Sequence, residues 1–241
     1  MEMKLFETHL LINKPRQLSF SFRSLVAREP KLWLLYQPYL AWSKIKLIAV
    51  GDDSQERMIT SNTELIIDGF QGSANSFATV AFQISQKRHV KLAHHLHAPS
   101  QIIQAIEKKI PVLLTVREPF GTVLSLVSRW PYISVTQGLK SYIGFYQKLE
   151  PYASNYVVST FEQTTKNLDS VIEAVNTKFA TNFDVVDVEK ANTEIRAKFA
   201  SEKETKRKIL KQEKKKDFAT ANNTKLLEEA NSLYQKYQSM N

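Results

Sequence analysis

The residues with the clearest chemical potential lie at 64–77, in the sequence ELIIDGFQGSANSF. A short apolar run leads into a turn rich in glycine, serine and asparagine, and the next residues, ATVAFQIS, favour a helix. A strand, a small-residue turn and a helix N-terminus together bind anions, because unpaired backbone N–H groups and the helix dipole face the ligand. Gly69 and Gly72 permit close approach of the backbone, while Ser73 and Ser76 add hydroxyl groups. We therefore expect a phosphate or sulfate ester to bind at this turn.

A second candidate is Arg117, which follows the apolar run IPVLLTV at 110–116. Arginine at a strand end can bind phosphate through two N–H groups. Ser125 comes eight residues later, within a predicted helix at 119–129, and could add a hydroxyl donor. The competing interpretation is a surface arginine paired with Glu118, beside a small residue at a helix contact.

Histidines form the third candidate, since four of the five lie between positions 89 and 97. If this segment is a strand, His95 and His97 share one face and His94 takes the other. His97 lies just before Pro99, where a general base near neutral pH could act at the strand's carboxyl end. A hydrogen-bonded structural histidine fits the same pattern. No third ligand of suitable spacing accompanies these residues, so no metal site is predicted.

Alternating strands and helices must position these groups. Apolar runs and helical periodicity predict strands at 65–68, 89–96, 110–116 and 156–159, and helices at 75–86, 100–108, 119–129, 137–149 and 166–179. Such alternation with nearly continuous apolar strands is typical of a parallel sheet covered on both faces. The expected fold is α/β, a P-loop-like three-layer arrangement around a central, mainly parallel sheet. Ligands in such folds lie at the carboxyl ends of the strands.

Helical extensions are expected at both ends of the α/β core. Residues 1–60 form a helical and irregular leader packed on the core at 61–190, and 191–241 form a basic helical extension, all within one structural domain. The apolar stretch at 32–42 is too short to span a membrane and is expected to break at Pro38; a core-packing helix pair is favoured over an interfacial contact. Helical spacing near the C-terminus predicts a docked helix through Leu226, Leu227, Ala230, Leu233, Tyr234 and Tyr237.

Composition limits the classes of partner. The chain has 241 residues, a net charge of +9 and no cysteine, which favours anionic partners and excludes disulfides and thiolate chemistry. The basic run at 203–216 contains glutamates and no aromatic residues, so a solvated helix is favoured over a nucleic-acid site. Without a recognisable secretory signal or membrane span, the expected location is the cytoplasm.

The order of these motifs resembles the sulfotransferase family that uses the donor phosphoadenosine phosphosulfate (PAPS). The resemblance covers about residues 62–185: the turn, then His97-x-Pro99, then Arg117 with a serine eight residues later, then a strand expected to end at Phe161 and Glu162. It is nearest to the bacterial sulfotransferase-like branch, whose loop typically reads Gly-Phe-Pro-Arg-Ser-x-Asn-Thr-Phe. Positions that match or nearly match that loop are Gly69, Phe70, Ser73, Asn75, Ser76 and Phe77.

The resemblance implies a role for each candidate residue. Arg117 and Ser125 would hold the 3′-phosphate of PAPS, and His97 would be the catalytic base. The implied activity is transfer of a sulfuryl group to a hydroxyl of a glycan or small metabolite, without a metal, which leaves 3′-phosphoadenosine 5′-phosphate. The 5′-phosphosulfate would be held by the loop residues Gln71, Gly72, Ser73, Ala74, Asn75, Ser76 and Phe77.

One departure from the family pattern affects the expected activity. Gly72 takes the place of the family's lysine or arginine, and Gln71 that of its proline. Loss of one such electrostatic contact lowers rates by roughly two to three orders of magnitude. The alternative is therefore a weak or inactive member of the fold that binds a nucleotide or sulfated glycan, and in which arginine at Gly72 would raise activity. Candidates for a basic cover over the 3′-phosphate are Lys206, Arg207 and Lys208.

A P-loop kinase is a third interpretation. The turn contains no lysine before its serine, and no strand with a terminal, Mg²⁺-binding aspartate is evident after it. Both features are required for transfer of a nucleotide γ-phosphate in P-loop enzymes. The sequence argues against this class.

Overall fold

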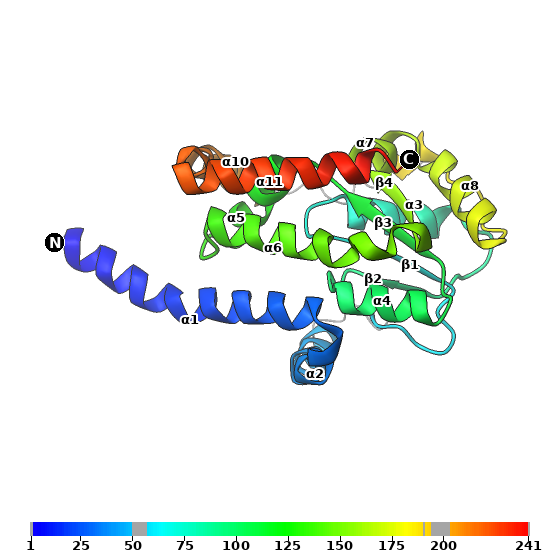
Figure 1. The fold of residues 1–241 in the computed structure, drawn as a ribbon, viewed down its shortest axis with the longest axis horizontal. Coiled ribbons are helices and arrows are strands. Elements are labelled where there is room, and N and C mark those ends of the chain that lie inside the picture. Colours follow the sequence, from blue (N-terminus) through cyan, green and yellow to red (C-terminus); the bar gives the residue numbers. More distant parts are fainter. Residues whose placement is uncertain (1, 50–56, 190, 194–202, 241) are drawn as a thin grey trace.

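A four-stranded parallel sheet forms the centre of the chain. The structure is a computed structural model that describes residues 2–49, 57–189, 191–193 and 203–240. Within these residues the strand order is β2-β1-β3-β4, and every neighbouring pair is parallel. The strands are β1 (Leu65–Gly69), β2 (Leu92–His94), β3 (Val112–Val116) and β4 (Val157–Thr160). Figure 1 shows helices on both faces of this sheet, so the predicted three-layer α/β arrangement is confirmed.

Alternation along the strands divides the core between the two faces. Ile66 packs with one group of helices, whereas Leu65 and Ile67 pack with the other, as side chains of a strand must alternate. The first face carries α4 (Pro99–Glu107), α5 (Pro119–Arg129), α6 (Val135–Leu149) and α11 (Ala221–Gln238). The second carries α3 (Asn75–Ser85) and α8 (Leu168–Phe179). Burial on both faces explains why the strands are apolar at nearly every position.

The strand order produces a crevice between β1 and β3. The chain leaves β1 toward β2 on one side, then crosses to β3 on the other, where Gly69 pairs with Thr115. Connections that depart in opposite directions leave space at the carboxyl ends of the two strands. The turn after β1 and Arg117 after β3 therefore meet at this point.

Two predicted strand ends were wrong. β2 covers only Leu92–His94 instead of 89–96, because His95 (φ 57°) and His97 (φ 55°) adopt left-handed backbone conformations that no strand accommodates. The prediction that these two histidines share a strand face is therefore wrong. Phe161 does not end a strand either: it begins the short helix α7 (Phe161–Lys166), which Thr160 caps at its N-terminus.

The N-terminal segment is helical, as predicted. It comprises α1 (Glu2–Arg28), a short 3₁₀ helix (Pro30–Leu32) and α2 (Trp33–Ala49), which continues through Pro38 instead of breaking there. Figure 1 shows α1 extending away from the sheet at its N-terminal end, while its C-terminal half lies beside α6. The Ser24 hydroxyl is 2.6 Å from the Ser141 hydroxyl across this contact.

The C-terminal segment packs on the first face of the sheet. Helix α10 (Lys203–Lys215) lies against α5, and a 3₁₀ helix (Lys216–Ala219) connects it to α11. Ala230, Leu233 and Tyr237 are buried, and the Tyr237 hydroxyl donates to the carbonyl of Tyr146 over 2.6 Å. The predicted docking of this helix is confirmed. No helix in the described ranges has the length and hydrophobicity to cross a bilayer.

We expect Gly69→Ala to destabilise the protein by about 1–3 kcal/mol, because a Cβ at this position would collide with the backbone carbonyl of Thr115. The measurement is the free energy of unfolding in urea. Gly144→Ala is the matched control, since its Cβ would meet only the flexible end of Arg28. Equal stability of the two variants would contradict the assigned approach of β1 to β3.

Candidate functional site

Buried hydrogen bonds fix the shape of the turn after β1. The Ser73 side chain is fully buried, and its hydroxyl lies 3.2 Å from the hydroxyl of Tyr146. Asn75 donates to the carbonyl of Phe70 over 2.9 Å and accepts from the Thr115 hydroxyl over 2.6 Å. These two predicted binding side chains therefore face the core, and they hold the turn rather than a ligand.

The outer surface of the turn is the N-terminus of α3. The helix begins at Asn75, and the first N–H groups of any helix have no acceptor within it. Its N-cap residue, Ala74, has φ 67° and supplies no side-chain cap. Ser76 is exposed there, and its hydroxyl lies 2.9 Å from Nε2 of His95. Backbone N–H groups and one hydroxyl thus form a surface that can bind an anion. Phe77 does not belong to this surface: it is half-buried against the core on the sheet face that carries α3 and α8.

The structure brings Arg117 and Ser125 to this turn. Nη1 of Arg117 donates to the carbonyl of Gly72 over 3.3 Å, and the guanidinium lies over the Phe161 ring at 4.2 Å. A Cβ built on Gly72 would lie 3.6 Å from the Ser125 hydroxyl, so α5 runs directly beside the turn. Arg117 also pairs with Glu118 at 3.3 Å, so the competing surface ion pair is present as well.

A buried carboxylate lies beside the turn, at the end of β1 and next to the segment that follows β2. Asp68 is fully buried at the end of β1, and its carboxylate accepts from the backbone N–H groups of Gly69 (2.9 Å), Leu96 (3.1 Å) and His97 (2.8 Å). Nδ1 of His97 lies 3.0 Å from the same carboxylate. Burial would raise the pKa of Asp68, but His97 and the Gly69 N–H hold it below its usual value. The carboxyl group is therefore ionised.

These contacts determine which nitrogen of His97 carries the proton. Nδ1 faces two acceptors, the Asp68 carboxylate and the Gly69 carbonyl at 2.8 Å, so it must be the protonated nitrogen of the neutral ring. None of the described residues is hydrogen-bonded to Nε2, which keeps its lone pair. The side chain is 17% exposed and lines a cavity, so Nε2 is available as a proton acceptor.

His95 and His94 do not share this environment. Burial, followed by the neighbouring His97 and His94 rings, lowers the pKa of His95 to about 3, so this ring is neutral at physiological pH. The Nδ1 atoms of His94 and His95 lie 2.7 Å apart. Among the residues whose placement is described, no group of three or more His, Asp or Glu side chains is arranged to hold a metal ion.

The cavity beside His97 has a volume of about 280 Å³. Its walls come from α1, α2, the turn after β1, the segment after β2 and the contact between α5 and α6. Phe70 and Gln71 of the turn line it, and Trp130 and Phe145 add aromatic rings. Its lining includes the arginines Arg23, Arg28, Arg57 and Arg129.

The sequence analysis missed Asp68 and these four arginines. A signal for Asp68 was present, since a single acid inside an apolar strand needs a buried partner. The arginines gave no signal, because they come from segments far apart in the chain. Of the proposed basic cover, Arg207 lies close enough to Arg129 to lower its pKa, after the larger effect of burial, whereas the Lys206 side chain falls outside the described residues.

Three comparisons with known proteins gave no further assignment. A scan of protein-family models, a search of curated proteins and a search of solved structures each found no match to this chain. The functional interpretation therefore depends on the geometry of the site.

We expect Asp68→Asn to lower the free energy of unfolding by about 2–5 kcal/mol, because an amide cannot satisfy the donors around this buried carboxylate. Urea denaturation at neutral pH measures the change. Asp217→Asn is the control: it removes only a surface pair with Lys214, worth about 0–1 kcal/mol. A loss no larger than the control's would contradict the assigned hydrogen bonds of the Asp68 carboxylate.

We also expect the free energy of unfolding to decrease as the pH is lowered from about 6.5 to 3, because of His95. In this range His95 is neutral in the folded chain and protonated in the unfolded chain, so the unfolded state binds one more proton and is favoured as pH falls. Each such proton gives a slope of about 1.4 kcal/mol per pH unit. His95→Gln should reduce the measured slope by about this amount, and an unchanged slope in this variant would contradict the assignment.

Proposed function

We propose that this protein is a PAPS-dependent sulfotransferase with a P-loop-like α/β fold. It transfers a sulfuryl group to the hydroxyl of an acceptor that enters the cavity beside His97. The observation that carries the proposal is the buried Asp68–His97 pair, which leaves Nε2 of the histidine unprotonated between the turn and the cavity. A base in this position accepts a proton from an acceptor hydroxyl.

The donor side of the site suits a phosphosulfate. The N–H groups of the first turn of α3, the Ser76 hydroxyl and the Arg117 guanidinium are the groups around the turn that can contact its oxygens. Ser125 lies beside them, where a second phosphate of the donor would bind. PAPS would supply the activated sulfuryl group and leave as 3′-phosphoadenosine 5′-phosphate.

The residues of the chain then have separate tasks. His97 accepts the hydroxyl proton at Nε2 as the acceptor oxygen bonds to sulfur, and the bond between sulfur and the 5′-phosphate oxygen breaks. Asp68 stabilises the resulting imidazolium through Nδ1. The N–H groups of α3 and Arg117 stabilise the negative charge on the departing phosphate.

Arg117 offers a source for the positive charge that the turn lacks. Its Nη1 hydrogen bond to Gly72 places the guanidinium against the residue that replaces the family's loop cation. Gly72 has φ 94°, and a Cβ there would come within 3.3 Å of the Thr122 carbonyl. Arginine at position 72 would therefore strain the backbone, and we do not expect Gly72→Arg to raise activity.

The second candidate function is nucleotide binding without turnover. It is favoured by one observation, the absence of any lysine or arginine side chain from the turn itself. Binding of the product nucleotide would then persist through α3, Arg117 and Ser125, while transfer would not occur. The kinase interpretation gains no support from the site, because the turn carries no lysine.

Transfer of ³⁵S from labelled PAPS to a panel of hydroxyl compounds tests the proposal. Wild type should label at least one acceptor, and His97→Gln should lower the rate by about 10²–10⁴-fold, the usual contribution of a general base. His89→Gln should match the wild type. Unimpaired transfer by His97→Gln would remove the assigned base.

Thermal stabilisation by 3′-phosphoadenosine 5′-phosphate tests the donor site separately. Wild type should gain about 2.7 kcal/mol at 100-fold over Kd. Arg117→Ala should gain less, and His97→Gln should gain as much as the wild type. Stabilisation without transfer to any acceptor supports the second candidate, whereas no stabilisation, or equal gains in wild type and Arg117→Ala, counts against both.

A further inference from the structure

The cavity beside His97 is rich in arginine. Four of its lining residues are arginines, and none of the 18 residues that line it within the described parts of the chain is Asp or Glu. Asp68 lies behind His97 and accepts from the N–H groups of Gly69, Leu96 and His97, while Glu29 lies beside Arg28 and is held by Lys148. Cations gathered around a cavity without acids raise the local concentration of anions and favour their binding.

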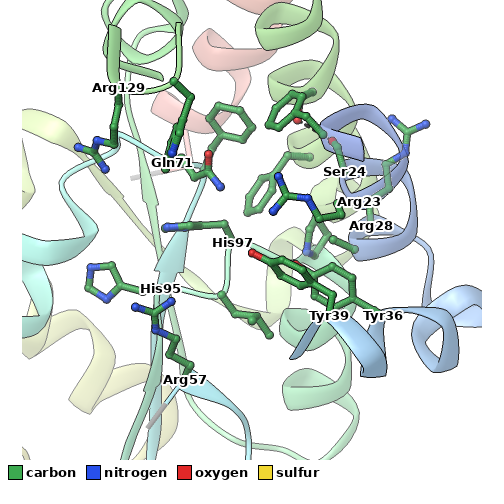
Figure 2. A pocket seen from close by; sticks show the side chains of 18 residues that line it. Arg23, Ser24, Arg28, Tyr36, Tyr39, Arg57, Gln71, His95, His97 and Arg129 are labelled. Carbon is green, nitrogen blue, oxygen red and sulfur yellow. Dashed lines mark hydrogen bonds between the residues drawn. The ribbon is translucent and has the colours of Figure 1, made fainter. Parts of the chain in front are cut away.

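Arg23 has the clearest orientation toward a ligand. Figure 2 shows Arg23 and Tyr39 extending into the cavity from α1 and α2, toward His97. Nε of Arg23 donates to the Ser19 carbonyl over 3.4 Å, and the guanidinium lies over the Tyr39 ring at 4.8 Å. Both contacts are to neutral groups, so the charge of Arg23 is positioned but not neutralised by them.

Arg28 is the second cation on the α1 wall. Its Nε is 3.9 Å from the carboxylate of Glu29, which is more closely held by Lys148 at 2.7 Å. The guanidinium lies over Gly144 of α6, where a Cβ would collide with it. Glycine at this position thus leaves room for Arg28 beside the cavity.

Arg129 adds positive charge from the opposite wall. Burial lowers the pKa of Arg129, and the nearby charge of Arg207 lowers it further. An anion in the cavity would be attracted by this side chain as well as by the arginines of α1.

The remaining lining defines the size and surface of the occupant. Tyr36, Tyr39 and Trp130 present ring surface, and the volume of about 280 Å³ is just below the usual range for small-molecule sites, about 300–1,000 Å³. A single ring with a short side group fits this space.

From this geometry we infer that the cavity selects a small hydroxylated acid. Its acidic group, a carboxylate or sulfate, binds Arg23 and Arg28 on the α1 wall, and its hydroxyl lies at Nε2 of His97. That this occupant is the acceptor rests on the proposed function; the preference for an anion rests on the cavity alone.

Binding of matched probes without any donor nucleotide tests the inference. The aryl series is 4-hydroxyphenylacetate, its neutral amide and the cationic tyramine; the sugar series is glucuronate, glucose and glucosamine. Calorimetry at pH 7.5 should show the anion of at least one series binding about 10–100-fold more tightly than its neutral partner, as expected for charge-assisted hydrogen bonds. The series that binds distinguishes an aryl acid from a sugar acid.

Three variants assign the preference to the α1 wall. Arg23→Gln should remove most of the anion's advantage and leave neutral-probe binding within about 2-fold, which also reports that the cavity remains folded. Gly144→Ala retains all charges but displaces Arg28, and should reduce the advantage several-fold. Arg16→Gln, on the exposed part of α1, is the control and should match the wild type.

Neutral probes that bind as tightly as the anions in both series would overturn the inference, as would an anion preference that survives in Arg23→Gln and Gly144→Ala. These outcomes are separable from the proposed function. Transfer of label to neutral hydroxyl compounds, without anion preference, would refute only the inference. Anion preference in a protein that binds no donor nucleotide would refute only the sulfotransferase.

Discussion

The Asp68 carboxylate is the interaction on which the rest of the site depends. It lies one residue before the end of β1, and it holds the segment after β2 by accepting from the N–H groups of Leu96 and His97. An ionised group without water must receive several hydrogen bonds to be tolerated in a core. Those bonds require the left-handed backbone at His97, which in turn directs its ring onto the same carboxylate. The same carboxylate therefore fixes both the backbone after β2 and the orientation of the His97 ring.

This arrangement separates two surfaces that lie on either side of His97. One is the N-terminus of α3, with Arg117 and Ser125 beside it, where the available groups are backbone N–H donors and a guanidinium. The other is the cavity lined by α1 and α2, where the available groups are arginines and aromatic rings. Both surfaces lie at the carboxyl ends of the parallel strands, where ligands bind in folds of this kind.

The α/β core was largely predictable from the sequence, because buried parallel strands are apolar throughout and their helices carry clear periodicity. The length of β2 was not, since the hydrogen bonds that end it come from Asp68 on another strand. The turn after β1 was found correctly, but the inward orientation of Ser73 and Asn75 depends on Tyr146 and Thr115, which lie far along the chain. The arginines of the cavity could not be predicted, because only tertiary packing brings α1 to α6.

The residues of the cavity wall on α1 and α2 come from a different part of the sequence than Asp68, His97 and the turn. Arg23, Arg28, Tyr36 and Tyr39 all belong to the helices that precede the first strand, whereas Asp68, His97 and the turn belong to the sheet edge. The two sets are therefore encoded by separate, consecutive stretches of the chain. Substitutions within the first stretch can therefore change the lining of the cavity while Asp68, His97 and the turn stay the same, so the two parts of the site can vary independently.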